Sequence, residues 1–282
     1  MSLENINWYP GHMKKTRELI QENHKLVDMV IEVVDARIPV SSRNPIIDEL
    51  ISGKPRFLVL NKSDLADEKS TKDWLKKFEE DYGRAIILDS MHGKGVPELL
   101  KRLTNYENEM NAERSRVKRL RVMIVGVPNV GKSSLINRLT GKKSTKTGDK
   151  PGVTKGKQWL TMENGMQLLD TPGILWPKFE DPNVGIKLAY CGSIKDEILD
   201  QETLALELIG YLGEEYPNLL MSRYKLDEIS EDKLFNMEAI AQKRGFIMAG
   251  KRIDYSRTAR TVLDEFRGGI IGKITLEKVK ND

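Results

Sequence analysis

The residues with the clearest chemistry are Gly126 to Ser133, GVPNVGKS, which match the pattern G-x-x-x-x-G-K-[ST]. In loops of this type, main-chain N–H groups wrap the β-phosphate of a nucleotide, the lysine reaches the β- and γ-oxygens, and the hydroxyl ligates Mg²⁺. Here those side chains are Lys132 and Ser133. The apolar run 122–125 precedes the loop and a helical pattern follows it, so the sequence predicts a phosphate-binding loop.

A nucleotide hydrolase also needs a carboxylate for magnesium and an N–H for the γ-phosphate, usually within the pattern D-x-x-G. This pattern is loose, and Asp149 and Asp181 begin rival matches. Only Asp170, in DTPG, follows an apolar strand pattern, MQLL. A strand would carry the carboxylate rigidly to the phosphate end of a sheet. We therefore predict that Asp170 and Gly173 serve this purpose.

The lysine-rich segment 141–157, GKKSTKTGDKPGVTKGK, runs between these two motifs. Its composition is that of a solvated, mobile loop. It also fits a switch segment that becomes ordered when Thr154 meets Mg²⁺ and the γ-phosphate. Both interpretations can hold, the first for the free protein and the second for the GTP-bound one.

A base-reading motif, Asn61-Lys62-Ser63-Asp64, lies far upstream of the phosphate loop. The Asp64 carboxylate could accept both donors on the Watson–Crick edge of guanine, where adenine offers no matching pair. The motif ends the apolar run PRFLVL, and a second strand pattern ends in Asp89-Ser90. These are parts of the guanine pocket of Ras-like GTPases, here placed before the phosphate-binding half. An ATPase with a coincidental NKSD is the alternative.

The elements that must position these motifs alternate between short apolar strands and amphipathic helices, which predicts a parallel sheet buried on both faces. Joining nearby termini and cutting one loop preserves the contacts of such a domain. We therefore predict an α/β, circularly permuted Ras-like domain over 1–178, with a base-binding half 1–103, a connector 104–120 and a phosphate-binding half 121–178. Residues 179–282 are expected to form a smaller, mostly helical C-terminal domain.

Composition narrows the class of protein. The chain has 282 residues, 39% of them hydrophobic, and a net charge of +4. The single Cys191 excludes an internal disulfide framework and a multi-cysteine metal site, and favours a reduced, cytosolic compartment. No apolar stretch reaches the roughly 20 residues of a membrane span, and the N-terminus lacks the apolar core of a signal peptide.

The permuted order, together with GVPNVGKS, PGVT, DTPGILWP and the N-terminal WYPGHM, resembles the bacterial ribosome biogenesis GTPase A family, the YlqF group. The resemblance is specific through about residue 200 and looser beyond it. It implies binding of GTP and GDP with Mg²⁺, hydrolysis of GTP, and a cytoplasmic role in late maturation of the large (50S) ribosomal subunit. The implied partner is a precursor of that subunit, its rRNA and ribosomal proteins, bound in a GTP-dependent way. The sequence does not determine the oligomeric state, and a monomer is the expectation.

The resemblance also assigns roles motif by motif. It gives guanine recognition to Asn61, Lys62, Ser63 and Asp64, with Asp89 and Ser90 closing on the base. It gives phosphate binding to Asn129, Val130, Gly131, Lys132, Ser133, Ser134 and Gly173. It makes Ser133 and Thr154 the ligands of Mg²⁺, with Asp170 supporting the site from behind these ligands.

The water-activating group is less evident. Ras-type enzymes place a glutamine directly after D-x-x-G, and here that position is Ile174, which cannot hydrogen-bond through its side chain. Intrinsic hydrolysis should therefore be slow, and stimulated by the particle. His12 in WYPGHM and a K⁺ ion held by Asn129 are the candidate sources of the missing group. With Lys132, Thr154 and Gly173, His12 completes the predicted catalytic set.

The C-terminal region carries basic residues that we expect to contact RNA. Because the DTPG loop leads into this region, nucleotide state is expected to change its placement. A nucleotide-gated RNA-binding module, or a GTPase acting on another RNA such as tRNA, are the other functions that the sequence allows. The basic residues are Lys243, Arg244, Lys251, Arg252, Arg257, Arg260 and Arg267.

Overall fold

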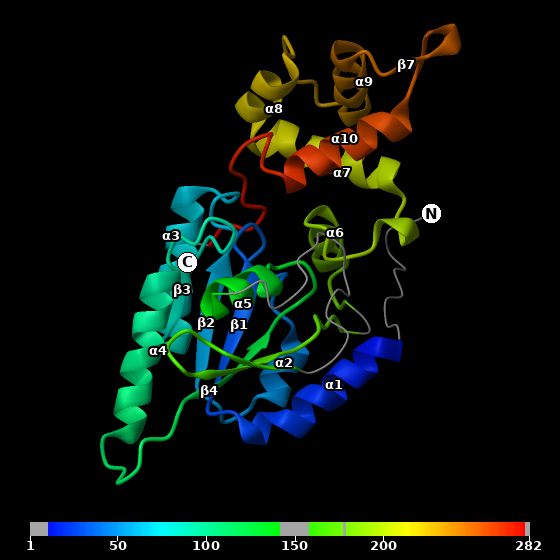
Figure 1. Ribbon diagram of the computed structural model, residues 1–282. Coiled ribbons are helices and arrows are strands. Elements are labelled where there is room, and N and C mark those ends of the chain that lie inside the picture. Colours follow the sequence, from blue (N-terminus) through cyan, green and yellow to red (C-terminus); the bar gives the residue numbers. More distant parts are fainter. Residues whose placement is uncertain (1–10, 142–157, 177–178, 280–282) are drawn as a thin grey trace.

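The computed structural model describes residues 11–141, 158–176 and 179–279 of the chain (Figure 1). Thr154 and Asp149 lie outside the described residues. The main chain of His12 lies in helix α1 (Gly11–Asn23), but its side chain is outside what is described. No helix within the described ranges is long and apolar enough to cross a membrane.

A six-stranded sheet forms the centre of the molecule, in the order β3-β2-β1-β4-β6-β5. All neighbouring pairs are parallel except β5 with β6, so the antiparallel edge strand departs from the predicted all-parallel sheet. The strands are β1 (Met29–Asp35), β2 (Arg56–Asn61), β3 (Ala85–Ile87), β4 (Arg121–Val125), β5 (Gln158–Thr161) and β6 (Gln167–Asp170).

The first strand of the chain lies in the middle of this sheet. β1 pairs with β2, which ends at Asn61, and with β4, which leads into the phosphate loop. Strands that are distant in the chain are therefore neighbours, and the carboxyl ends of β2 and β4 flank that of β1. This order is consistent with the predicted circular permutation.

Helices cover both faces of the sheet, as the apolar strands predict. On one face Ile31 and Val33 of β1 pack in a core with Leu99 of α4 (Val96–Asn111) and Leu135 of α5 (Lys132–Thr140). On the other face Val30 packs with residues of α1 and of α2 (Pro45–Leu50), and a separate cluster lies under α3 (Glu68–Tyr82). All seven residues of β1 are buried in consequence.

The first part of the predicted connector 104–120 is helical, because α4 continues through Asn111. Glu107 of this helix is buried, accepts a hydrogen bond from Leu120 N at 2.7 Å, and pairs with Arg119 at 3.3 Å. The helix therefore packs onto the domain as far as this residue. Only 112–120 form the irregular link into β4.

The C-terminal region is mostly helical, as predicted, and lies beyond the carboxyl edge of the sheet (Figure 1). A small β-hairpin, β7 (Ile247–Met248) with β8 (Arg252–Ile253), was not predicted. The helices of this region are α6 (Pro182–Tyr190), α7 (Gln201–Glu215), α8 (Pro217–Tyr224), α9 (Lys233–Arg244) and α10 (Tyr255–Arg267), with short 3-10 turns at Asp196–Ile198 and Ala249–Lys251. A further 3-10 turn, His24–Leu26, follows α1.

Residues 268–279, the C-terminal tail, leave this helical region and return to the first half of the chain near α3 (Figure 1). Ile274 N donates to Leu65 O at 3.0 Å and Leu276 N donates to Arg37 O at 2.8 Å. Trp74 Nε1 of α3 donates to the carbonyl of Glu277 at 2.8 Å. The last described residues thus pack on the base-binding half. The prediction placed them in the C-terminal domain that begins after residue 178.

Candidate nucleotide site

The phosphate loop connects β4 to α5 and is shaped by two glycines. Gly126 has φ 150°, and a Cβ there would lie 2.4 Å from Val33 O of β1. Gly131 has φ 93°, and a Cβ there would lie 2.2 Å from Asn61 Nδ2. Only glycine allows both the backbone conformation and the close approach. The predicted loop therefore lies directly against the carboxyl ends of β1 and β2.

Lys132 begins α5 and is almost fully buried. Its Nζ donates to Gly126 O at 3.0 Å and to Val127 O at 2.8 Å, so the ammonium lies over its own loop. Burial lowers the pKa of Lys132 to about 8, against the opposing effect of the Asp170 charge. A polyanion at this loop would favour the charged form and bring the lysine to its phosphate oxygens.

The DTPG segment lies beside this loop. Asp170 ends β6, opposite Ile124 of β4, and Thr171 Oγ1 donates to Ile124 O at 2.6 Å. A Cβ on Gly173 would lie 2.7 Å from Pro128 N and 3.1 Å from Lys132 Nζ. The rival Asp181 instead caps α6, accepting from Asn183 N at 2.9 Å. The strand argument thus selected the aspartate that lies beside the phosphate loop.

Oxygen ligands of the kind Mg²⁺ prefers are available there. Ser133 follows Lys132 in the first turn of α5, where its side chain is half-buried, and Asp170 is buried at the strand end. A hydroxyl and a carboxylate at the phosphate end of a sheet fit this ion. Ser134, the last of the predicted phosphate contacts, is half-buried in the same turn.

Ile174 lies with its side chain in the hydrophobic core of the GTPase-like domain. Its side chain is fully buried, in the same core cluster as Ile20 and Ile47. Its N–H donates to Gly126 O at 3.3 Å, and its carbonyl accepts from Asn44 Nδ2 at 2.9 Å. The residue after DTPG therefore anchors that segment to the core.

Asn61 joins three loops at the carboxyl edge of the sheet. Its Nδ2 donates to Val130 O of the phosphate loop at 2.8 Å, and its Oδ1 accepts from Ser90 N at 3.0 Å. The side chain is fully buried. Both polar atoms of Asn61 thus hold neighbouring loops, and because its amide carries a second N–H, the predicted contact of Asn61 with the base stays a prediction. Ser63 N is likewise held, donating to Leu88 O at 3.1 Å.

A buried ion pair that the sequence analysis missed supports Lys62. Arg37 donates to both carboxylate oxygens of Asp35, at 2.9 and 2.8 Å, and Lys62 Nζ lies 3.3 Å from Asp35 Oδ2. Burial alone would raise the pKa of Asp35, but the charges of Arg37 and Lys62 hold it well below its usual range. The available signal was an aspartate directly at the end of the apolar strand β1.

Asp64, Asp89 and His92 lie together at the opening of the base site, with one ligand atom of each within 4.8 Å of the others. Burial first, and then the neighbouring Asp89 charge, raise the pKa of Asp64. Asp89 shapes a turn, accepting from His92 N at 2.9 Å and lying 2.7 Å from His92 Nδ1. Asp64 remains the carboxylate available to a base.

Asn129 in the phosphate loop reaches the C-terminal helices. It adopts φ 60°, and its Nδ2 donates at 3.2 Å to the carbonyl of Cys191, at the end of α6. Lys62 also has φ 60°. Two of the four non-glycine residues with positive φ in the described ranges are therefore in the predicted nucleotide motifs, as is common for strained functional loops.

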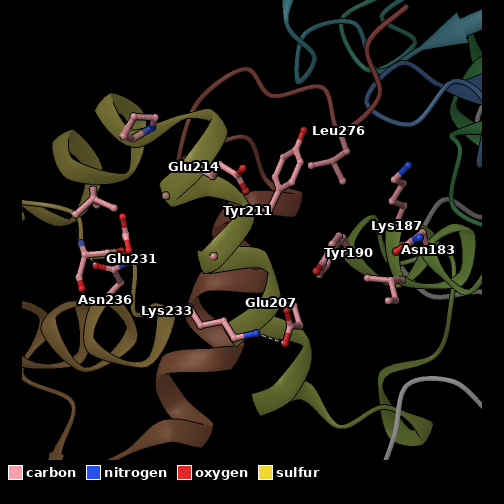
Figure 2. Close-up of a pocket in the computed structure, with 16 residues that line it drawn as sticks. Asn183, Lys187, Tyr190, Glu207, Tyr211, Glu214, Glu231, Lys233, Asn236 and Leu276 are labelled. Atoms are coloured by element: carbon pink, nitrogen blue, oxygen red, sulfur yellow. Dashed lines mark hydrogen bonds and ion pairs between the residues drawn. The ribbon is translucent and has the colours of Figure 1, made fainter. Parts of the chain in front are cut away.

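A hollow of about 930 Å³ lies apart from this site, between α6, α7 and the segment before α9 (Figure 2). Both acidic and basic side chains line it, and Lys233 forms an ion pair with Glu207 across it. Tyr190 and Tyr211 also line it. None of the residues predicted to bind the nucleotide lines this hollow. We therefore assign the hollow no role in nucleotide binding.

Comparison with known proteins identifies a characterised sequence family and several full-length relatives. Residues 121–211 match a family described as 50S ribosome-binding GTPase. The chain is 49% identical to ribosome biogenesis GTPase A of Bacillus cereus, over 96% of this chain and 93% of that protein. It is 35% identical to ribosome biogenesis GTPase A of Thermotoga maritima, over 97% and 94%, and 34% identical to mitochondrial ribosome-associated GTPase 1 of Bos taurus, over 96% and 88%.

Solved structures give the same result. A GDP-bound YlqF structure matches with a TM-score of 0.68 and 31% identity, over 93% of this chain and 100% of that one. The GNP-bound YlqF of Thermotoga maritima matches with a TM-score of 0.67 and 31% identity, over 94% and 98%.

Proposed function

Because this chain belongs to the ribosome biogenesis GTPase A family, we propose that it is a cytoplasmic GTPase that assists late maturation of the large ribosomal subunit. The reaction is GTP and water to GDP and phosphate. The observation that carries the proposal is the contact between the base motif and the phosphate loop, where Asn61 bonds Val130 O and Ser90 N in one buried junction. That junction supports a single nucleotide bound by both halves of the chain.

The base-binding and phosphate-binding halves divide the nucleotide between them. Asp64 reads the two donors of guanine, and Lys62 supports that loop through Asp35. The N–H groups of 129–134 and of Gly173 bind the phosphates, with the Lys132 ammonium over them. Ser133, Thr154 and Asp170 would hold Mg²⁺, which neutralises phosphate charge when bound. These are the family assignments, in which Asn61 also joins the base motif to the phosphate loop through its bond to Val130 O.

Water activation is assigned to His12 together with a K⁺ ion at Asn129. Support comes from Ile174, whose burial removes the usual glutamine position from the site. The Oδ1 of Asn129 is left for a cation because the hydrogen bond to Cys191 uses Nδ2. Hydrolysis by the protein alone should therefore be slow.

His12→Ala is expected to leave nucleotide affinity nearly unchanged and to slow particle-stimulated hydrolysis by about tenfold or more, the range of a positioned catalytic group. Phosphate release is measured with and without ribosomal particles. Replacing K⁺ by Na⁺ should slow the reaction further in both the parent and the variant, because that effect acts through Asn129. An unchanged stimulated rate would leave His12 without a catalytic role.

The proposed partner is a precursor of the large subunit, bound through its RNA. Nucleotide state can influence that binding because Asn129 of the phosphate loop contacts the end of α6, which leads into the C-terminal helices. A GTPase acting on another RNA, or a module in which hydrolysis only resets RNA binding, remain the alternatives.

Co-sedimentation tests this function. The protein should pellet with large-subunit precursors in the presence of a non-hydrolysable GTP analogue, and less with GDP or with no nucleotide. Single-turnover hydrolysis should be faster with those particles than with small subunits or tRNA. Equal pelleting in all three states, or stimulation by tRNA alone, would contradict the proposal.

A further inference from the structure

We infer that Arg138 is a positioning residue for guanine recognition, holding the turn 89–93 so that the N–H of Met91 faces the base. This inference rests on the proposed guanine site and extends it to a residue that belongs to neither nucleotide motif. Arg138 lies in α5, the helix that follows the phosphate loop.

The guanidinium of Arg138 contacts the turn at several points. Nε donates to Ser90 O at 3.2 Å, and Nη2 donates to Met91 O. A Cβ on Gly93 would lie 3.7 Å from the guanidinium carbon, so the group lies flat against that residue. No carboxylate within the described ranges forms an ion pair with Arg138, and these two carbonyls are its hydrogen-bond partners there.

Each of these carbonyls shares a peptide unit with the N–H of the next residue, so holding the carbonyl also holds that N–H. A peptide unit is planar and trans, so its C=O and N–H point in opposite directions. Holding Ser90 O therefore turns the N–H of Met91 away from α5, and holding Met91 O turns the N–H of His92 the same way. The second of these N–H groups donates to Asp89 Oδ1 at 2.9 Å. The N–H of Met91 makes no hydrogen bond to any residue of the described chain.

The remainder of the turn is held from other directions. Ser90 N donates to Asn61 Oδ1, and Gly93 N donates to Asp89 O at 2.8 Å. Gly93 and Gly95 have positive φ, a conformation that glycine adopts without the steric cost it has for other residues. Arg138 is therefore the contact that holds the Ser90–Met91 peptide unit, whereas the next unit is held by both Arg138 and Asp89 Oδ1.

The N–H of Met91 would have an acceptor on guanine but not on adenine. Guanine presents a carbonyl oxygen at C6, adjacent to the donors that Asp64 accepts, whereas adenine presents an amine there. An N–H fixed towards that position forms a hydrogen bond with guanine and opposes adenine. Arg138 thus links the phosphate-loop helix to the discrimination between bases.

The test measures GDP and 6-thio-GDP affinities of the full-length protein. The thio analogue keeps both donors for Asp64 and replaces the carbonyl oxygen by sulfur, a weaker acceptor. Arg138→Ala should weaken GDP binding by about tenfold, the upper range of one hydrogen bond, and 6-thio-GDP binding by much less. The preference for GDP over the analogue should shrink accordingly. Arg138→Lys, which keeps a cation and a donor, should lie between the parent and the alanine variant.

Arg114→Ala is the matched control, because Arg114 is also exposed and its Nε also donates to a main-chain carbonyl, that of Met110 in α4, at 3.0 Å. It should leave both affinities unchanged. Equal losses for GDP and 6-thio-GDP in Arg138→Ala would indicate general damage to the loop and overturn the inference, as would an unchanged GDP affinity. Equal binding of GDP and ADP by the parent would instead contradict the proposed guanine site itself.

Discussion

Replacing Asp64 by asparagine should weaken GTP binding well over tenfold and raise the affinity for xanthosine triphosphate. The carboxylate accepts two donors of guanine, and its loss leaves them facing an amide that can accept only one. Loss of a charged hydrogen-bonded pair in a site typically costs a few kcal/mol. Xanthine presents a carbonyl where guanine has an amine, so it can accept from the amide of the new side chain. Fluorescent-nucleotide titration measures both affinities.

Two properties of Asp64 separate this effect from damage to the fold. The first is that Asp64 bonds no other residue in the described ranges, in contrast to Asn61 and Asp89, so the change should leave the fold intact. The second is its pKa. Because burial and Asp89 raise the pKa of Asp64, and the bound guanine favours the charged carboxylate, GTP affinity of the parent should fall at acidic pH while that of the variant should not. Equal affinity of the parent for ATP and GTP would refute the guanine assignment.

Changing Lys251, Arg252, Arg257 and Arg260 together to alanine should strongly weaken binding to large-subunit precursors. All four are exposed, and none forms an ion pair with the described residues. The neighbouring basic residue Lys243 is left out of the variant because it already forms an ion pair with Asp227. Binding to RNA phosphates releases counterions, so the slope of log affinity against log salt should flatten by up to about one unit for each phosphate that the variant no longer neutralises. Pelleting over a salt series measures it.

A matched control removes four charges elsewhere. GTP affinity and basal hydrolysis should be unchanged in both variants, because neither set lies at the nucleotide site. Particle binding unaltered in the first variant, or weakened equally in the control, would exclude a specific RNA contact by the C-terminal region. The control changes Lys72, Lys76, Lys77 and Arg102, each of which has an acidic partner four positions away on its own helix.

The strand ends were predictable from sequence because apolar runs that end in polar residues mark where a buried sheet meets its ligand edge. This reasoning located Asp64, the loop at Lys132 and Asp170 at the carboxyl ends of β2, β4 and β6, which belong to one sheet. The α/β class followed from the same alternation of strands and helices. It could not indicate that β5 is antiparallel, since a short edge strand has no pattern that distinguishes its direction.

Contacts made by side chains across long separations were not predictable. The Asp35–Arg37 pair is buried among apolar neighbours, where composition favours hydrophobic residues. Arg138 is one arginine among many, and only the fold shows which carbonyls it meets. No motif in the sequence of the tail 268–279 indicates a long-range contact. In the structure, Glu277 accepts hydrogen bonds from Val40 N and Ser41 N, 237 and 236 residues earlier in the chain.

The returning tail has a consequence for how the protein is made. Asp67 N, three residues after Asp64, donates to Thr275 Oγ1, a partner 208 residues later in the chain. At about 5–20 residues per second, a translating ribosome needs about 10–40 s to reach that partner after synthesising the base-reading loop. Until then Asp67 N lacks this partner, and we expect the segment after the base-reading loop to be held less firmly. We therefore expect tight nucleotide binding only after Thr275 has been synthesised.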